Sequence, residues 1–252
     1  MANSDNFIFL GPNYFRLDGG KISDSGTLTN YYAEDAFDAR ADTYWYSSST
    51  STSDSLYIDC GATLAESANR LFVDGNVSDF TLYWSSDQSV WTSALDVTGA
   101  TASYLHTLSD TQAVRYWRFL ASGTSSASQY RQIKRLGLYT YQYQFSDSRN
   151  PFFTPELLEA GQEGMTWDNL AWTPKLREAA ALSLEIEQLA DAGYATLLSI
   201  FRNYRNFMAI YPQPRTFPAE LYDVKLAGSY ALKYRTKNPS LGRSGTLSFR
   251  SA

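Results

Sequence analysis

Short runs of aromatic and β-branched residues, separated by polar tracts, are the feature that most constrains how this chain folds. They recur from Leu56 to Tyr139, with one serine-rich stretch before them at 47–55 and another between the last two at 122–128. Runs of this length and spacing are typical of strands in an antiparallel sandwich or jelly roll, and they disfavour a helical bundle. The expected strands are Leu56–Cys60, Asn69–Val73, Phe80–Trp84, Tyr104–Leu108, Val114–Leu120 and Ile133–Tyr139.

The composition excludes several classes of partner. The formal net charge is −5, so no net basic field attracts a phosphate backbone, and we expect no nucleic-acid partner. The single cysteine, Cys60, excludes an intrachain disulfide and a thiolate-rich metal site. No apolar stretch approaches the ~18 residues that cross a bilayer, so we expect no membrane insertion. The first residues lack the features of a signal peptide, which predicts folding in a cytoplasm.

The C-terminal part of the sequence mixes strand and helix patterns. From Asp191, a candidate N-cap, apolar residues recur at helical spacing and predict a helix that ends before Phe207. Upstream, Leu182–Ile186 alternates like a strand, which we favour, although Leu182, Ile186 and Leu189 also fit one helical face. Further expected strands are Phe207–Tyr211, a hairpin of Tyr222–Leu226 and Tyr230–Tyr234 around Ala227-Gly228, and Thr246–Phe249.

Turn and breaker residues separate these two regions. Gln144–Trp172 contains Asn150-Pro151, Thr154-Pro155, Gly161 and Gly164, a composition that indicates a connection. The sequence therefore predicts a domain at 1–143, a linker at 144–172 and a second domain at 173–252. The fold class expected is mainly β, with one α+β domain.

Three segments of the first region, in order, resemble the discoidin family, also called coagulation-factor type C domains. The first is Ala36–Trp45, an alanine-phenylalanine-aspartate turn followed by Thr43, any residue and Trp45. The second is Leu56–Gly61, a strand that ends in aspartate, a small residue and glycine. The third runs from Leu82–Asp87 through Trp91 to Val114–Arg118 and Ile133–Tyr139. The resemblance covers roughly half of the chain. It implies a galactose-binding-like β-jelly roll.

Several conspicuous residues receive structural roles in this interpretation. Trp45 and Trp117 are expected in the core, because a buried tryptophan is ordinary in a sandwich. Asp59, before Gly61, is expected to accept hydrogen bonds from turn amides.

Many members of this family hold calcium with the aspartate of the early turn, the threonine before the tryptophan, carbonyl groups and a glutamate in the last strand. Asp38 and Thr43 match, but Arg135 stands where the glutamate falls. A guanidinium does not ligate calcium, so no metal or other cofactor is expected. We hypothesise instead that Arg135 pairs with Asp38 or Asp42 and ties the last strand to the first loop.

The family resemblance also implies a site for sugars in the loops at one end of the roll, formed by aromatic and polar side chains. The same tyrosine-rich loops are equally suited to protein contacts. The candidate ligand contacts are Tyr31, Tyr32, Tyr44, Tyr46, Trp91, Tyr130 and Arg131.

The second region, Leu182–Phe249, resembles the small split β-barrel with one helix found in bacteriophage tail-tube and distal tail proteins. The resemblance implies a virion structural protein of a tail tip or baseplate, made in the host cytoplasm, with other virion proteins or further copies of itself as partners. Its candidate interface is the basic hairpin with Lys225, Lys233 and Arg235.

No catalytic constellation is apparent in the sequence. The lone histidine, His106, has no nucleophile elbow to serve, and Glu185 and Glu187 are expected on a solvated strand face. We therefore expect no enzyme. The alternatives to a virion role are a carbohydrate-binding adhesin for host surface glycans and an accessory module of a glycosidase.

Overall fold

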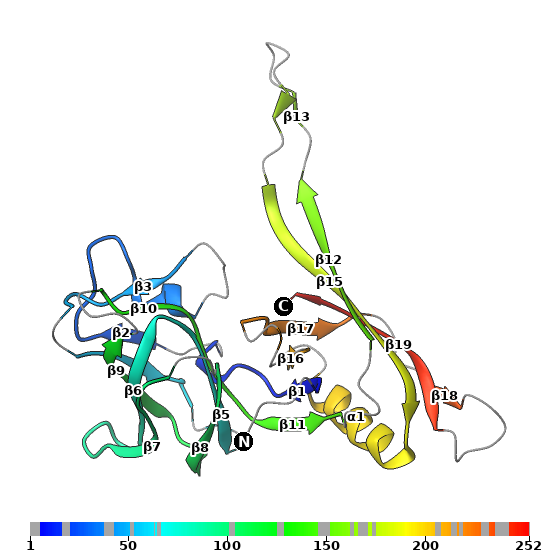
Figure 1. The fold of residues 1–252 in the computed structure, drawn as a ribbon, viewed down its shortest axis with the longest axis horizontal. Coiled ribbons are helices and arrows are strands. Elements are labelled where there is room, and N and C mark those ends of the chain that lie inside the picture. Colours follow the sequence, from blue (N-terminus) through cyan, green and yellow to red (C-terminus); the bar gives the residue numbers. More distant parts are fainter. Residues whose placement is uncertain are drawn as a thin grey trace. The chain divides into compact units, whose positions relative to one another are not determined.

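The protein is mainly β, as the sequence predicts, with one α-helix among the residues that the structure describes (Figure 1). No described helix is long and apolar enough to cross a membrane. The computed structural model describes residues 6–16, 21–37, 43–50, 53–62, 64, 67–100, 104–124, 129–145, 152–161, 164–165, 171–172, 175–204, 208–212, 216, 219–227, 232–234 and 242–251.

The chain forms two compact units. The sandwich unit comprises Leu10–Gln142 and Gln213–Glu220, and the helix-containing unit comprises Met1–Phe9, Tyr143–Pro212 and Leu221–Ala252. The N-terminal residues thus belong with the C-terminal part of the sequence, whereas the sequence analysis assigned them to the first domain. The reason is a strand, β1 (Ile8–Leu10), that joins the sheet of the helix-containing unit.

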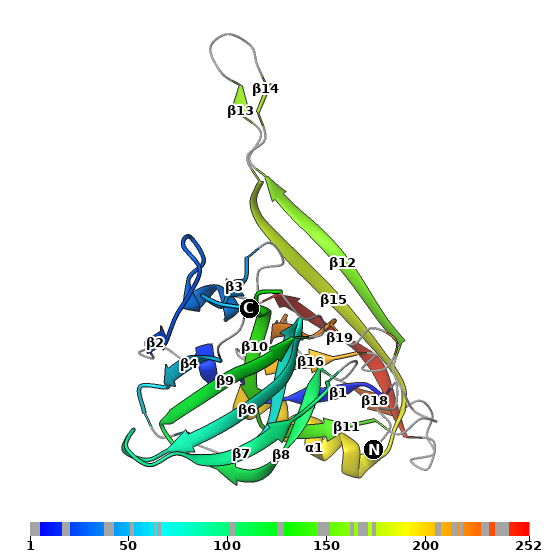
Figure 2. The same ribbon diagram turned by 60° about the vertical axis from the view of Figure 1, so that its left-hand side comes forward.

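Two antiparallel sheets make up the sandwich unit. The five-stranded sheet has the order β2-β4-β9-β6-β7, and the four-stranded sheet has the order β3-β10-β5-β8 (Figures 1 and 2). Each predicted strand of this region lies in or overlaps one of them. Two short 3-10 helices, η1 (Tyr14–Arg16) and η2 (Ala33–Ala36), accompany the sheets. The strands are β2 (Lys21–Asp24), β3 (Trp45–Tyr46), β4 (Asp54–Asp59), β5 (Ala68–Gly75), β6 (Val77–Ser85), β7 (Thr92–Val97), β8 (Leu105–Gln112), β9 (Tyr116–Thr124) and β10 (Gln132–Tyr139).

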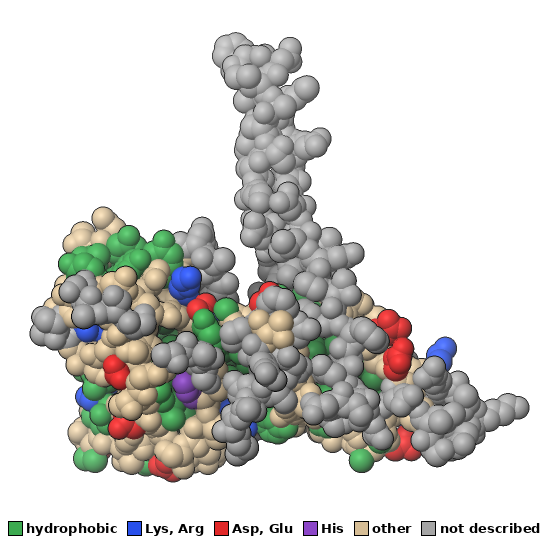
Figure 3. Space-filling model, in the orientation of Figure 1, with side chains coloured by type: hydrophobic (Ala, Val, Ile, Leu, Met, Phe, Trp, Pro, Cys, Tyr) green, Lys and Arg blue, Asp and Glu red, His purple; other side chains and the backbone are tan. Residues whose placement is uncertain are grey.

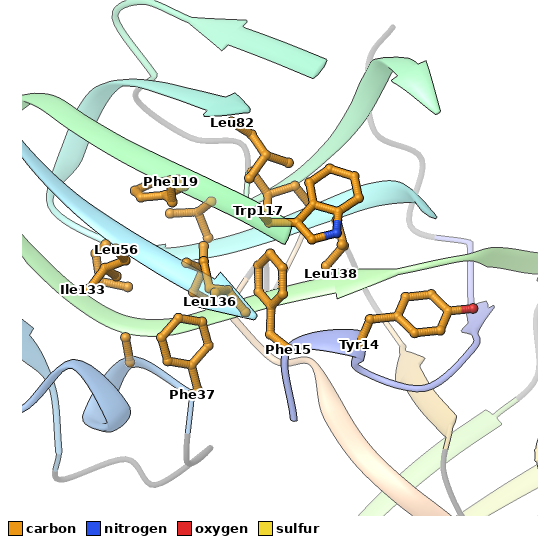
Figure 4. Close-up of a cluster of buried hydrophobic side chains, with 14 of the residues drawn as sticks. Tyr14, Phe15, Phe37, Leu56, Leu82, Trp117, Phe119, Ile133, Leu136 and Leu138 are labelled. Atoms are coloured by element: carbon orange, nitrogen blue, oxygen red, sulfur yellow. The ribbon is translucent and has the colours of Figure 1, made fainter. Parts of the chain in front are cut away.

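The core of the sandwich unit lies between the two sheets. Alternate residues of each strand point inward, so Leu56 of β4, Leu82 of β6 and Trp117 of β9 meet Leu136 and Leu138 of β10 (Figure 4). The rings of Phe15 and Phe37 close the same cluster, with 5.7 Å between their centroids. Truncation of a buried aromatic residue to alanine typically costs about 3–5 kcal/mol, so these side chains account for much of the stability of this unit.

The helix-containing unit is built around one eight-stranded sheet. Its path runs β11-β1-β16-β17-β19-β15-β12, and β18 also pairs with β19. The helix α1 (Asp191–Tyr204) begins at the predicted N-cap and buries Leu197, Ile200 and Phe201. The strands are β11 (Tyr141–Gln144), β12 (Phe152–Gly161), β15 (Lys175–Leu189), β16 (Met208–Tyr211), β17 (Tyr222–Leu226), β18 (Lys233–Tyr234) and β19 (Arg243–Ser251), and β13 (Gly164–Met165) pairs with β14 (Ala171–Trp172) in a separate sheet.

A cluster of phenylalanines binds the N-terminus to this unit. The ring of Phe9 lies 5.8 Å from that of Phe201 in α1 and 6.1 Å from that of Phe249 in β19. The ring centroids of Phe7 and Phe145 are 6.0 Å apart, and the Phe145 amide donates a hydrogen bond to the Phe7 carbonyl group. Burial of these rings explains why a strand as short as β1 is ordered.

Two details of this unit differ from the sequence analysis, and one that the sequence left ambiguous is decided. Residues 144–172, expected as a linker, include β12, which pairs with β15 along most of its length. The ambiguous segment before the helix is a strand, as favoured. The predicted hairpin around Ala227-Gly228 is wrong within the described residues, because β17 pairs with β16 and β19, and β18 pairs with the far end of β19. The long β19 provides backbone partners that a local pattern does not reveal.

Beyond β19, the sheet continues as only two strands. β15 pairs with β19 from Ala181 to Leu189, whereas its first residues pair with β12 alone. Figures 1 and 2 show this two-stranded ribbon extending past the rest of its sheet. In the order of the sheet, β12 is the edge strand.

Candidate functional site

Three tyrosines form a cluster in the sandwich unit. Tyr46 lies on β3, Tyr44 just before it, and Tyr31 in the loop after β2. Ring centroids are 4.6 Å apart for Tyr31 and Tyr46, 5.3 Å for Tyr44 and Tyr46, and 6.0 Å for the stacked pair Tyr31 and Tyr44. All three side chains are partly exposed. The structure therefore brings together three of the seven predicted ligand contacts, which we call the tyrosine cluster.

Backbone and hydroxyl hydrogen bonds hold the loop of Tyr31 against β3. The Thr27 hydroxyl donates to the carbonyl groups of Tyr31, at 2.5 Å, and Tyr46, at 3.1 Å. The Leu28 amide donates to the same Tyr46 carbonyl at 3.1 Å. Asn30 has a φ of 72°, a left-handed conformation that asparagine tolerates better than most residues. The tyrosine cluster is thus positioned by a tight turn, and its geometry does not depend on a ligand.

The phenol group of Tyr46 stays neutral at physiological pH. Partial burial, followed by the proximity of Tyr44 and Tyr31, raises the pKa of Tyr46 above its ordinary value. A second group near this end, Asp24, also has a raised pKa, first through burial and then through the negative charge of Glu34. Tyr46 therefore contributes a neutral hydroxyl group and a ring face to the cluster.

Figure 3 shows hydrophobic side chains gathered on the surface of the sandwich unit over the region that carries β3 in Figure 1. Next to the cluster in sequence, Tyr32 is among the most exposed large side chains, at 64%. Its amide donates to the Asp35 carboxylate at the start of η2. Tyr130, 40% exposed, precedes β10, and its carbonyl group accepts a hydrogen bond from Asn76. These two residues remain candidates for contact with a ligand.

Arg131 requires a correction. It was expected to reach a ligand from a loop, but only 2% of it is exposed. Its guanidinium donates to the Ser49 carbonyl at 2.9 Å and lies 3.6 Å from the Asp54 carboxylate. The Arg131 amide donates to the Ser47 hydroxyl group. Arg131 therefore connects the loop after β3 to the start of β10. Its charge can be buried because the ion pair with Asp54 compensates for the lost hydration.

Trp91, the last of the seven candidates, lies elsewhere on the unit. It follows the end of β6, whereas Asn76 precedes the start of that strand. The ring centroids of Trp91 and Tyr57 are 6.2 Å apart. The guanidinium carbon of Arg118 lies 5.5 Å from its ring centroid. The sequence analysis missed Tyr57, Tyr83 and Arg118 as surface candidates. Their alternation with buried residues was visible, but the pairing of three strands that joins them was not.

The residues assigned structural roles lie in the scaffold. Trp45 and Trp117 are buried completely. Asp59 accepts the Gly61 amide at 2.8 Å and two hydrogen bonds from Arg115, at 2.6 and 2.8 Å. These bonds, with Arg115 the largest cause, hold the pKa of Asp59 below its usual range.

The ion pair of Arg135 with Asp38 or Asp42, predicted in place of a calcium site, falls partly outside the described residues. Asp38 and Asp42 are not described, so their pairing with Arg135 stays a prediction, and Thr43 is partly buried. Arg135 lies across from Asp74 on β5, with its guanidinium over the Phe72 ring. No group of three or more histidine, cysteine or acidic side chains able to hold a metal occurs in the described ranges.

The predicted basic interface is spread over two strands. Lys225 lies in β17 and is partly buried, whereas Lys233 in β18 is exposed, and Arg235 lies outside the described residues. Both described lysines are on strands that pair with β19 rather than with each other.

No family model and no curated protein match this sequence. Among solved structures, a GH29 fucosidase mutant of Ruminococcus gnavus in complex with fucose is 17% identical, with a TM-score of 0.43, over 51% of this chain and 26% of that protein. Chitosan-binding module 1 of a chitosanase/glucanase from Paenibacillus sp. IK-5 is 18% identical, with a TM-score of 0.43, over 50% of this chain and 98% of the module. CBM32-3 of a family 31 glycoside hydrolase from Clostridium perfringens is 19% identical, with a TM-score of 0.42, over 48% and 91%. The case for a function rests on this chain's own side chains.

Proposed function

We propose that this chain is a carbohydrate-binding protein without catalytic activity, and that the tyrosine cluster of its sandwich unit contacts the sugar. The observation that carries the proposal is the packing of Tyr31, Tyr44 and Tyr46 into one partly exposed group. A tyrosine ring offers an apolar face to the C–H face of a pyranose and a hydroxyl group to its oxygens.

Preorganisation supports this proposal. Each ring already contacts the other two, and the loop of Tyr31 is hydrogen-bonded to β3 through Thr27 and Leu28. Side chains that are ordered before binding lose little conformational entropy when a ligand arrives. Tyr32 and Tyr130, which are exposed, are suited to extend the contact.

The test is binding of the purified protein to a glycan array, followed by titration calorimetry with the best glycan. We expect Tyr46→Ala to weaken binding at least tenfold, and Tyr46→Phe, which keeps the ring, to weaken it less. The matched control is Tyr194→Phe in α1, which removes a hydroxyl group from the other unit. A folded wild-type protein that binds no glycan, or a Tyr46→Ala variant that binds as well as wild type, would refute the proposal.

A second candidate function, assembly with other proteins, is favoured by the two-stranded ribbon of β12 and β15. An isolated pair of strands is at best marginally stable in water, and its open edge favours pairing with another chain. A ribbon that extends past its sheet is therefore suited to docking on a partner or on another copy of this chain. A place in a virion, such as a tail tip or baseplate, stays a prediction.

This second function is tested by shortening the ribbon. Glu156 and Ala181 are paired residues, so an Asn-Gly turn joined between them closes the hairpin below the extension. We expect the full chain to form oligomers in sedimentation velocity and the shortened chain to be monomeric with unchanged binding of glycans. A full chain that is monomeric at high micromolar concentration would count against self-assembly.

A further inference from the structure

A row of three aligned side chains crosses the outer face of the five-stranded sheet. Tyr57 of β4 pairs with Arg118 of β9, which in turn pairs with Tyr83 of β6. Their neighbours Leu56, Trp117 and Leu82 point into the core, so these three point outward. Figure 2 shows β9 and β6 side by side.

Two aromatic rings hold the Arg118 guanidinium. Its central carbon lies 4.6 Å from the Tyr83 ring centroid and 5.5 Å from that of Trp91. Trp91 in turn contacts Tyr57 at 6.2 Å with an interplanar angle of 63°. All four side chains are partly exposed. We call this group the arginine platform.

Among the residues that the structure describes, Arg118 differs from Arg115 and Arg131 in having no carboxylate partner. Arg115 pairs with Asp59, and the buried Arg131 pairs with Asp54. In the described part of the chain no carboxylate pairs with Arg118, and its Nε atom is buried without a hydrogen-bond partner. In a protein of net charge −5, Arg118 is a partly exposed cation packed against aromatic rings, and because its Nε atom is buried an external anion would contact the terminal nitrogens of the guanidinium.

We propose that the arginine platform binds the carboxylate of an acidic sugar, such as a uronic acid residue of a polysaccharide. A guanidinium recognises a carboxylate through two parallel hydrogen bonds. The rings of Tyr57 and Trp91 beside it provide apolar surface for the pyranose ring. A sugar carboxylate uses both the charge and the rings.

The platform is separate from the tyrosine cluster. Tyr46 of the cluster pairs with Gln132, whose amide donates to Asn76, the residue just before β6. Trp91 follows the other end of β6. The proposal therefore goes beyond the proposed function, and it stands even if the tyrosine cluster binds no glycan.

The test is titration calorimetry of the full chain with tetragalacturonate and with its full methyl ester. We expect the acid to bind and the ester, which lacks the negative charge, to bind at least tenfold more weakly. Tyr194→Phe, in α1 of the helix-containing unit, should leave binding of tetragalacturonate unchanged. Equal binding of acid and ester, or no binding of the acid, overturns the proposal.

Variants of the platform locate the binding. Arg118→Gln should weaken binding of tetragalacturonate at least tenfold, and Arg118→Lys, which keeps the charge but not the paired hydrogen bonds, about threefold. Lys134→Gln, at an exposed position of β10, is the control for the same loss of charge. If Arg118→Gln does not fold, Trp91→Ala, in a loop, replaces it with the same expected loss. Unchanged affinity in the folded variants, or equally tight binding of hexaglutamate, overturns the assignment to an acidic sugar.

Discussion

The guanidinium of Arg131 lies 3.6 Å from the carboxylate of Asp54, and both side chains are buried. Burial disfavours the charged form and lowers the pKa of Arg131, while the Asp54 charge opposes this change. The pair links the start of β4 to the residue just before β10. A residue that appears from the sequence to be a ligand contact thus belongs to the scaffold.

The first prediction concerns the loss of one partner of this pair. Arg131→Met leaves the Asp54 charge buried, so it should lower the free energy of unfolding by about 3–5 kcal/mol. The double variant Arg131→Met/Asp54→Asn, which keeps an acceptor for the Ser48 amide, should recover at least half of that loss. Urea unfolding at pH 7 measures both values. A double variant as unstable as the single one would show that the ion pair is not the cause.

Gly75 is predicted to be intolerant of a side chain because β5 and β10 approach closely there. A Cβ atom at Gly75 would collide with the Gln132 carbonyl oxygen, which belongs to the backbone and cannot turn away. We expect Gly75→Ala to cost about 3 kcal/mol in thermal or urea unfolding. Gly99, with a φ of 65° and open space around it, is the matched control, and Gly99→Ala should cost about 1 kcal/mol. The reverse order of the two losses would contradict this geometry.

The lowered pKa of Asp59 predicts how the free energy of unfolding changes at acid pH. Its pKa is lowered in the folded state, so its contribution is complete above the unfolded value of about 3.9 and is lost as the pH falls through the folded value. The difference in free energy of unfolding between wild type and Asp59→Asn should therefore shrink as the pH falls from 5 to 2. In an Arg115→Gln background the same substitution should show a weaker dependence on pH. A difference that is constant from pH 5 to 2 would mean that Asp59 has no lowered pKa.

Cys60 is predicted to be inert toward thiol reagents while the chain is folded. Burial, followed by the neighbouring Asp59 charge, raises the pKa of the thiol to about 12. Because the thiolate is the reactive form, labelling by a disulfide reagent at pH 8 should be at least a hundredfold slower than in urea-unfolded protein. The chain has no other cysteine, so the signal reports this position alone. Comparable rates in the two states would contradict the burial of Cys60.

The sequence was informative where a local pattern determines the structure. The run Val114–Leu120, predicted as a strand despite its imperfect period of two, overlaps β9, and Asp191 marked the start of α1. The segment before the helix was ambiguous, because Leu182, Leu184 and Ile186 alternate like a strand whereas Leu182, Ile186 and Leu189 fit one helical face. Pairing of β15 with β12 and β19 on either side decided it. Tertiary contacts override a weak local preference.

The candidate sites were harder to predict because they depend on pairing between distant strands. Tyr31, Tyr44 and Tyr46 were recognisable as loop aromatics, and the structure groups them. Tyr57, Arg118 and Tyr83 are separated by many residues and form a row only through the register of three strands. No local pattern encodes such a register, since each residue by itself is an ordinary outward position of a strand.

The place of β1 in the larger sheet has a consequence for how this protein can be rebuilt. The chain leaves that sheet at β1 and returns to it at β11, and these two strands are immediate neighbours. The segment between them is thus one long connection of this sheet, and it contains every strand of both sandwich sheets. Such a cassette is open to exchange: a short turn joining Leu10 to Tyr141 would close the gap, and a module of different specificity would fit between the same two attachment points.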